Sequence, residues 1–190
     1  MTVFYKEADV AHIKSQLDAW LKSVVIGLNL CPFANKPYIK KKVRLSVELG
    51  NSEADIVSCL LNELILLSND SEKLIETTLI AVPNIFQDFI DYNDFLYSAD
   101  ELLIKHGYEG VFQIASFHPQ YQFSDTEPTA AENFTNRAPY PLFHIIREES
   151  LSEAIDLFPG VEQIPNRNIV KMNALSNQKL KNLFPWYFIL

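Results

Sequence analysis

The chain has 190 residues, of which 48% are hydrophobic and 21% are charged, and it contains two cysteines. This length suits a single domain, residues 1–190, that buries a core without disulfides or a structural metal. The net charge of −8 argues against nucleic acid and anionic membrane surfaces as partners, because an acidic chain is repelled by both.

No segment has the pattern of a membrane span or an export signal. The apolar runs are shorter than the roughly 20 residues that a spanning helix needs, and residues 1–9 are polar and acidic. We therefore expect a cytoplasmic protein with reduced thiols and no membrane partner. One basic segment stands out, and we interpret it as a solvated turn rather than a phosphate site; it contains Lys36, Lys40, Lys41, Lys42 and Arg44.

Helical and strand patterns alternate over the first two thirds of the chain. The apolar spacing predicts, in order, a helix over 9–30, a strand over 43–49, a helix over 52–68, a strand over 77–82, a helix over 86–106 and a strand over 111–117. Asp9 is expected to cap the first helix, and Ser52 with Asp55 forms a capping-box pattern for the second. Gly107 is expected to end the third.

This order predicts an α/β fold. Residues 43–117 are expected to form a βαβαβ unit, which pairs its strands in parallel. A fourth strand over 142–147 and a helix that begins at Ser150 and Glu153 make up a segment over 142–158. We predict one mixed, mostly parallel sheet of about four strands with helices packed on it. A ferredoxin-like α+β sandwich is the alternative.

The C-terminal extension, residues 160–190, has a weaker pattern. It predicts a helix over 173–184, followed by an apolar tail over 184–190. A tail of this composition is expected to dock on the domain or on a second subunit, because it is too apolar to remain in water. A homo-oligomer formed through the tail follows from the second option.

The connection over residues 118–141 has neither a helical nor a strand period. Loops of this length in compact domains are usually functional or disordered, and four aromatic residues argue against disorder here. The loop follows a predicted parallel strand, and open α/β sheets bind ligands at the carboxyl ends of such strands. We therefore predict that it forms most of a ligand or catalytic site.

Two histidines border this loop. His118 follows the third strand directly and is a candidate general base or hydrogen-bond donor. A structural histidine bonded to the backbone is the alternative. His144 lies inside the fourth strand, where a substrate-binding role and a buried core histidine are equally consistent with the pattern.

The segment 133–137 is dense in hydrogen-bond donors. Arg137 supplies a fork that suits a carboxylate or phosphate, and Asn133, Thr135 and Asn136 surround it in the sequence. Arg147 adds a second cation, and Tyr140 is held between two prolines. Stabilisation of a tight turn by the Asn and Thr side chains is the alternative.

Cys31 is the candidate nucleophile. A thiol can act in this way when its pKa is lowered and a base lies beside it. The predicted helix ends at this residue, and the partial negative charge of a helix carboxyl end should instead raise the thiol pKa. An inert buried thiol is therefore the alternative.

Several motifs together resemble one family. They are Trp20, the segment 25–34 (VIGLNLCPFA), 115–119 (ASFHP), 133–141 (NFTNRAPYP), His144, 147–150 (REES) and 164–168 (IPNRN). These residues are similar to an uncharacterised bacterial family that is known as a domain of unknown function (DUF1415-like). The resemblance implies a single-domain protein of similar length, and it implies no activity, cofactor or catalytic residue.

Three functional hypotheses follow from these residues. The first is a small-molecule enzyme in which His118 transfers a proton, Arg137 binds an anionic substrate and Cys31 lines the pocket. The second is a metabolite-binding or protein-interaction module, since no complete catalytic signature occurs. The third is a metal site formed by Cys31, His118, His144 and a loop carboxylate. The sequence implies no particular cofactor.

Overall fold

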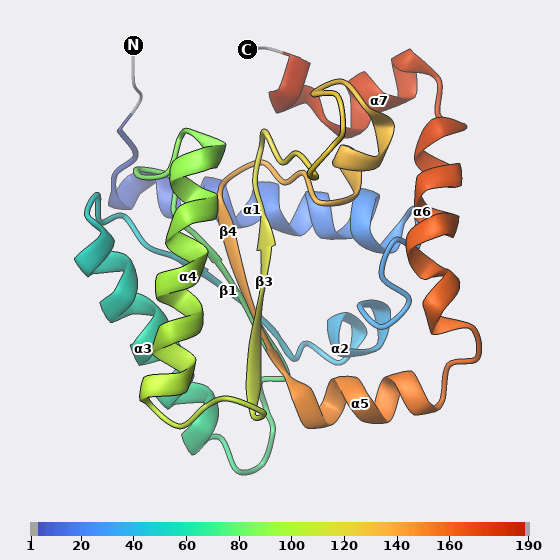
Figure 1. Ribbon diagram of the computed structural model, residues 1–190. Helices are drawn as coiled ribbons and strands as arrows, with labels where there is room; N and C mark the ends of the chain where they lie inside the picture. Colours follow the sequence, from blue (N-terminus) through green and yellow to red (C-terminus); the bar gives the residue numbers. More distant parts are fainter. Residues whose placement is uncertain (1–3, 189–190) are drawn as a thin grey trace.

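The computed structural model describes residues 4–188, so residues 1–3 and the end of the predicted tail, residues 189–190, lie outside the described part. Figure 1 shows the arrangement of the elements. In chain order they are η1 (Glu7–Asp9), α1 (Val10–Trp20), η2 (Leu21–Ile26), α2 (Asn35–Ile39), β1 (Val43–Val47), α3 (Glu53–Asn69), β2 (Thr77–Ala81), α4 (Phe89–Lys105), β3 (Phe112–Phe117), η3 (Ala131–Thr135), β4 (Leu142–Arg147), α5 (Glu148–Asp156), η4 (Val161–Gln163), α6 (Ile164–Asn173), α7 (Asn177–Leu183) and η5 (Pro185–Phe188).

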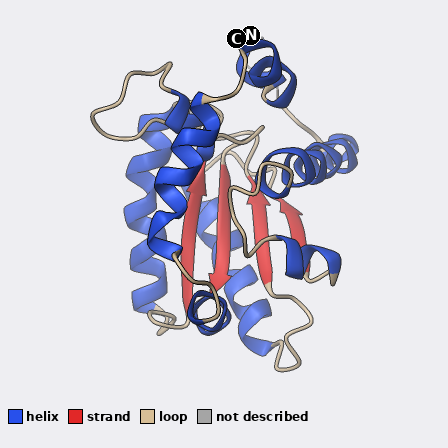
Figure 2. Ribbon diagram, turned by 90° about the vertical axis from the view of Figure 1, so that its right-hand side faces the viewer, coloured by secondary structure: helices blue, strands red, loops and turns tan. Residues whose placement is uncertain are grey.

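The four strands form one mixed sheet in the order β1-β2-β4-β3. β1 and β2 pair in parallel, whereas β4 pairs antiparallel with both of its neighbours. In Figure 2 one arrow accordingly points against the other three. The predicted α/β sheet is confirmed, but its mostly parallel pairing is wrong. Phe117, at the end of β3, pairs with Leu142, at the start of β4. The loop between them therefore stays at one end of the sheet, and β4 runs back along β3.

Helices cover both faces of this sheet. One face packs on α3 and α4 through a core that includes Leu60, Tyr92 and Phe143. The other face packs on α1, η2 and the C-terminal helices through a core that includes Leu17 and Met172. A ferredoxin-like sandwich does not fit this arrangement, because it leaves one face of its sheet without helices.

The first helix is shorter than predicted. α1 ends at Trp20 and continues as a single π-type stretch, η2, to Ile26. The chain then turns, with Asn29 at a φ of 49°, so the helix ends before Cys31. Asp9 does not cap α1; its carboxylate accepts a hydrogen bond from the backbone N–H of Lys6 instead.

Two of the predicted helix boundaries are confirmed. Ser52 and Asp55 form the capping box of α3. Gly107, at a φ of 73°, follows the end of α4, where a left-handed conformation suits glycine.

The C-terminal part differs most from the prediction. α5 begins at Glu148, directly after β4, without the expected Ser150 cap. The helix expected over 173–184 is present in a shorter form as α7, and α6, which precedes it, was not predicted. The apolar tail docks on the domain, because Phe184 is fully buried and its ring contacts that of Phe134 edge to face. Among the residues that the structure describes, no helix is long and apolar enough to cross a membrane.

Candidate functional site

The long loop lies where its position in the sequence predicted. It leaves β3 at residue 117, forms the short helix η3 and returns to β4 at residue 142, so it covers the carboxyl end of β3. The yellow and orange ribbon in Figure 1 shows this path beside α6 and α7.

His118 is buried, with both ring nitrogens bonded to backbone. Nδ1 accepts from the N–H of Gln120 at 3.0 Å, which leaves Nε2 to donate to the carbonyl of Phe86 at 2.9 Å. Burial lowers the pKa of His118 to about 4. A neutral ring without a free nitrogen has no lone pair available for proton transfer, so this geometry fits the structural alternative.

The amide and hydroxyl side chains of the 133–137 segment hold the loop together. Asn133 accepts from the N–H of Phe123 and from the hydroxyl of Thr126, and donates to the carbonyl of Glu127. Asn136 donates to the carbonyl of Ser116 and accepts from Thr135. These bonds are those of an ordered turn, as the alternative reading proposed.

Arg137 connects two parts of the loop through its hydrogen bonds. Nε donates to the carbonyl of Tyr121 and one terminal nitrogen donates to the carbonyl of Pro128. The guanidinium lies over the rings of both Phe134 and Tyr187, at 4.2 and 4.0 Å from their centroids, and these two rings contact each other edge to face. The other terminal nitrogen, NH1, is buried and has no hydrogen-bond partner in the part of the chain described here.

The structure does not bring His118 and Arg137 into one cavity. The imidazole packs between Phe89 and Tyr92, on the α4 side of the sheet. The guanidinium packs with Phe134, which belongs to the core on the α1 side. The predicted partnership of these two side chains is therefore not formed, although both border the Tyr121 segment.

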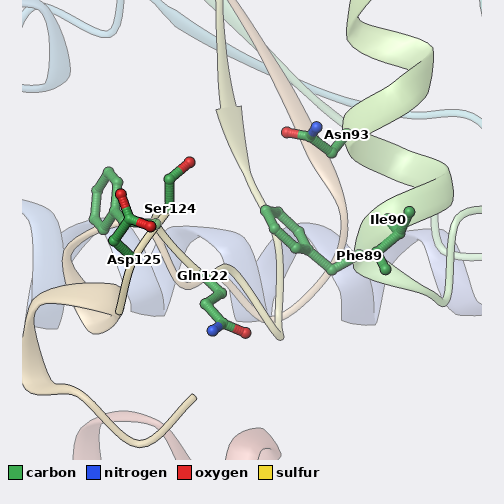
Figure 3. A pocket seen from close by; sticks show the side chains of 7 residues that line it. Phe89, Ile90, Asn93, Gln122, Ser124 and Asp125 are labelled. Atoms are coloured by element: carbon green, nitrogen blue, oxygen red, sulfur yellow. The ribbon is translucent and has the colours of Figure 1, made fainter. Parts of the chain in front are cut away.

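A hollow does open beside the loop, as Figure 3 shows. Its volume is about 300 Å³, and it is lined by Phe89, Ile90 and Asn93 of α4 and by Gln122, Phe123, Ser124 and Asp125 of the loop. The lining offers neutral polar groups and one carboxylate but no cation. It therefore does not suit the anionic ligand that the sequence predicted.

Tyr140 and Arg147, both predicted to bind substrate, make internal contacts. The hydroxyl of Tyr140 donates to Gln16 of α1. Arg147 donates to the carbonyls of Leu67 and Ile75, and its guanidinium lies 3.6 Å from the carboxylate of Asp70. These bonds join β4 to the end of α3 and leave Arg147 no role in the loop.

Of the two histidines in the predicted site, His144 keeps a ring nitrogen without a hydrogen bond. The hydroxyl of Thr77 donates to the carbonyl of Ile145, so it must accept from Nε2 of His144, 2.5 Å away. Nδ1 is then unprotonated, and no described residue bonds to it. Burial lowers the pKa of His144 to about 4, so the ring is neutral and half-buried on the face of the sheet toward α1.

Cys31 lies in the turn that follows η2 and packs against the core on the α1 side. Burial raises the pKa of its thiol, although the nearby N–H groups of Phe33 and Ala34 oppose this shift. The direction agrees with the sequence prediction, but the cause is burial rather than a helix end. Among residues 4–188, no three His, Cys, Asp or Glu side chains gather as a metal site, so the Cys/His metal hypothesis lacks a ligand set.

α6 packs directly on the turn that holds Cys31. The amide nitrogen of Asn168 donates to the carbonyl of Leu30 at 2.7 Å, and Lys171 donates to the carbonyl of Leu28. Arg167 lies one helical turn before Lys171, on the same side of α6. Its Nε and NH2 atoms are buried, and no described residue accepts from them; the Oδ1 atom of Asn168 is likewise buried without a partner.

Sequence reasoning did not assign Arg167 and Asn168 to a site. Both fall in the 164–168 motif, but the helical pattern there is weak because Pro165 stands in its first turn and polar residues interrupt its apolar stripe. The signal that could have identified them is the spacing of Arg167, Asn168 and Lys171, which places all three on neighbouring positions of one helix face.

Comparisons with known proteins give one match. A family model described as "Protein of unknown function (DUF1415)" matches residues 12–182. No curated protein and no solved structure matches the chain.

Proposed function

The chain belongs to the DUF1415 family, whose function is unknown, and we propose that it binds a small molecule by a carboxylate or phosphate group between α6 and the turn over residues 28–31. The sequence predicted an anionic ligand held by Arg137. We retain an anionic small molecule as the ligand, but we assign its binding to Arg167.

The unpaired guanidinium of Arg167 is the observation that carries this proposal. Arg167 is half-buried, and donors of a cation that are shielded from water without a partner or a counter-ion are unfavourable. None of the ion pairs found within residues 4–188 includes Arg167. Nε and NH2 lie on one edge of the guanidinium and form the fork that binds two oxygens of a carboxylate or phosphate. An anion at this edge would satisfy both donors and balance the charge.

Asn168 narrows the chemistry of the ligand. Its amide nitrogen is committed to Leu30, so the buried Oδ1 can only accept a hydrogen bond. A ligand that satisfies both residues therefore carries an oxyanion and a hydrogen-bond donor such as a hydroxyl group. Hydroxy acids and singly protonated phosphate esters have both. The ammonium group of Lys171, on the same side of α6, adds positive charge.

An enzymatic role requires a proton acceptor in addition. His144 offers the unprotonated Nδ1 on the sheet face that α1 and Cys31 also cover. The predicted base would then be His144 rather than His118, whose nitrogens are both bonded. A binding protein that is not an enzyme needs only Arg167 and Asn168. If His144→Ala loses turnover but still binds the ligand, the protein is an enzyme; if there is no turnover to lose, it is a binding protein.

Thermal unfolding in the presence of anions tests the proposal. Sodium phosphate and sodium malate, each matched to sodium chloride of equal ionic strength, are expected to raise the melting temperature of the native chain, because a ligand that binds only the folded state stabilises it. Arg167→Leu is expected to abolish this increase. Arg44→Gln is the control, since Arg44 is paired with Glu63 and its loss should leave the anion effect intact.

The same variant separates a ligand contact from a structural one. Replacing a half-buried cation whose buried donors are unpaired by an apolar side chain should leave the melting temperature without ligand unchanged or raise it. If Arg167→Leu unfolds at a much lower temperature and no anion stabilises the native chain, Arg167 is a packing residue and the proposal is wrong.

A further inference from the structure

The outer edge of the sheet beside β1 combines three features that point to one kind of partner. β1 is an edge strand, because within residues 4–188 it pairs with β2 and with no other strand. Next to it lies a hollow of about 370 Å³, lined by Asp18, Leu21, Tyr38, Ile39, Lys41, Val43 and Leu45. This edge is separate from the α6 site and from the loop over 118–141.

The backbone of β1 has free hydrogen-bonding groups on its outer side. The carbonyl of Lys42 accepts from the N–H of Thr77, and the N–H of Glu48 donates to the carbonyl of Ala81. In a parallel ladder the groups that face the neighbouring strand come from alternate residues. The N–H and carbonyl groups of Val43, Leu45 and Val47 therefore point away from the sheet, where an added strand can bond to them.

The hollow offers an apolar surface to the side chains of such a strand. Val43 and Leu45 form its floor at the sheet edge, and Leu21 and Tyr38 form its wall. Ile39, at its rim, has 69% of its surface exposed and adds apolar surface to the hollow. A chain added to β1 would place every second side chain over this hollow, because side chains alternate between the faces of a strand.

The charge around the edge is opposite to that of the whole protein. Lys36, Lys40 and Lys41 are exposed, and within the described residues none of them forms an ion pair. Asp18, the carboxylate in the hollow, is already bonded to Lys22 and Tyr38, and the hydrogen bond from Lys22 is the main reason that its pKa is lowered. The net field at this edge therefore attracts negative charge, although the chain carries −8 overall.

We propose that the β1 edge binds an extended, acidic peptide segment of a partner protein, which adds a fifth strand to the sheet. The free backbone groups select an extended chain, the hollow selects apolar side chains at alternate positions, and the three lysines select Asp and Glu between them. Recognition by strand addition in other proteins uses the same division between main-chain bonds and side-chain pockets.

Selection from a displayed library of random linear peptides on the immobilised full chain tests this proposal. The enriched peptides are expected to alternate apolar with acidic residues. Synthetic copies of the most enriched peptide, labelled with fluorescein, then give its affinity by anisotropy. N-methylation of alternate amides that face β1 should abolish binding, because it removes the main-chain donors without changing the side chains.

Two double variants complete the test. Lys40→Glu with Lys41→Glu should weaken binding at least about tenfold, as expected from two reversed surface charges. Lys105→Glu with Lys179→Glu is the matched control, with the same charge change on exposed residues elsewhere, and should leave the affinity within about twofold.

Four outcomes would overturn the proposal. The first three are a selection that enriches no peptide, an N-methylated peptide that binds as well as its parent, and equal effects of the two double variants on affinity. The fourth is a sedimentation experiment in which the chain is a dimer and the Lys40→Glu, Lys41→Glu variant is a monomer. In the last case the occupant of the edge is a second copy of the chain.

Discussion

The indole N–H of Trp20 donates a hydrogen bond to the backbone carbonyl of Arg137 at 3.0 Å, across 117 positions of the sequence. This bond joins the end of α1 to the centre of the long loop, and it is buried. Trp20→Phe should lower the free energy of unfolding by at least about 2 kcal/mol, because it leaves a buried carbonyl without a donor. Chemical denaturation followed by circular dichroism measures this loss.

Trp186 is the matched control for that substitution. Its indole nitrogen is buried and has no partner in the described part of the chain, so Trp186→Phe removes an unsatisfied donor. We expect a change within about 0.5 kcal/mol or a gain in stability. Equal losses in the two variants would mean that ring volume, rather than the Trp20 hydrogen bond, determines the effect.

Stability should fall as the pH is lowered from 6.5 toward 4. Burial depresses the pKa of His118 in the folded chain to about 4, from 6.5 in an unfolded one. The unfolded state therefore takes up a proton first, and the stability present above pH 6.5 is lost as the pH approaches 4. A shift of this size corresponds to about 3 kcal/mol.

His118→Gln tests the source of this dependence. The variant removes the imidazole, so the difference in stability between pH 6.5 and pH 4 should be smaller than in the native chain. His144, which shifts in the same direction for the same reason, is retained and leaves part of the dependence. An unchanged pH profile in His118→Gln would contradict the assignment to His118.

The C-terminal segment is expected to stabilise the chain in which it lies. Phe184 is fully buried against Phe134, so Phe184→Ala should cost about 3–5 kcal/mol. Leu157→Ala is the control, because 83% of Leu157 is exposed. Light scattering should give the same mass for both variants as for the native chain; a lower mass for Phe184→Ala alone would favour the oligomer that the apolar tail first suggested.

The parts of the fold that follow local rules could be predicted from the sequence. The capping box at Ser52 and the strand β1, whose Val43, Leu45 and Val47 pack on one core, depend on neighbouring residues, and both are confirmed. The position of β4 depends on how the loop returns, which no periodicity encodes, and this is why the mostly parallel sheet was wrong. The π-type stretch after Trp20 likewise has no signal in the spacing of apolar residues.

In the candidate site, too, residue types could be predicted from the sequence, whereas their contacts depend on the fold. Residue chemistry predicted that His118 would transfer a proton and that Arg137 would bind an anion; in the fold both side chains are buried. It could not predict which backbone carbonyls these side chains would bond, because Phe86 and Pro128 become their partners only in the fold. Arg167 was not selected because its lack of a partner is a property of packing and not of sequence.

The thiol of Cys31 should react slowly in the folded protein. Burial raises its pKa, and the thiolate is the species that attacks an alkylating agent, so each unit of increase lowers the reactive fraction about tenfold. Cys59 provides an internal comparison, because burial raises its pKa to about 12. The rate of alkylation by iodoacetamide at pH 7.5 is measured by mass spectrometry for each thiol separately. Cys59→Ser retains only Cys31, and Cys31→Ser retains only Cys59. We expect the alkylation rate of each thiol to be at least about tenfold below that of free cysteine, and to reach the rate of free cysteine in denaturant.

Rapid reaction of Cys31 in the native chain, with a rate that no longer rises above pH 8, would require a lowered pKa. The turn beside Arg167 and Lys171 would then hold a nucleophile as well as an anion.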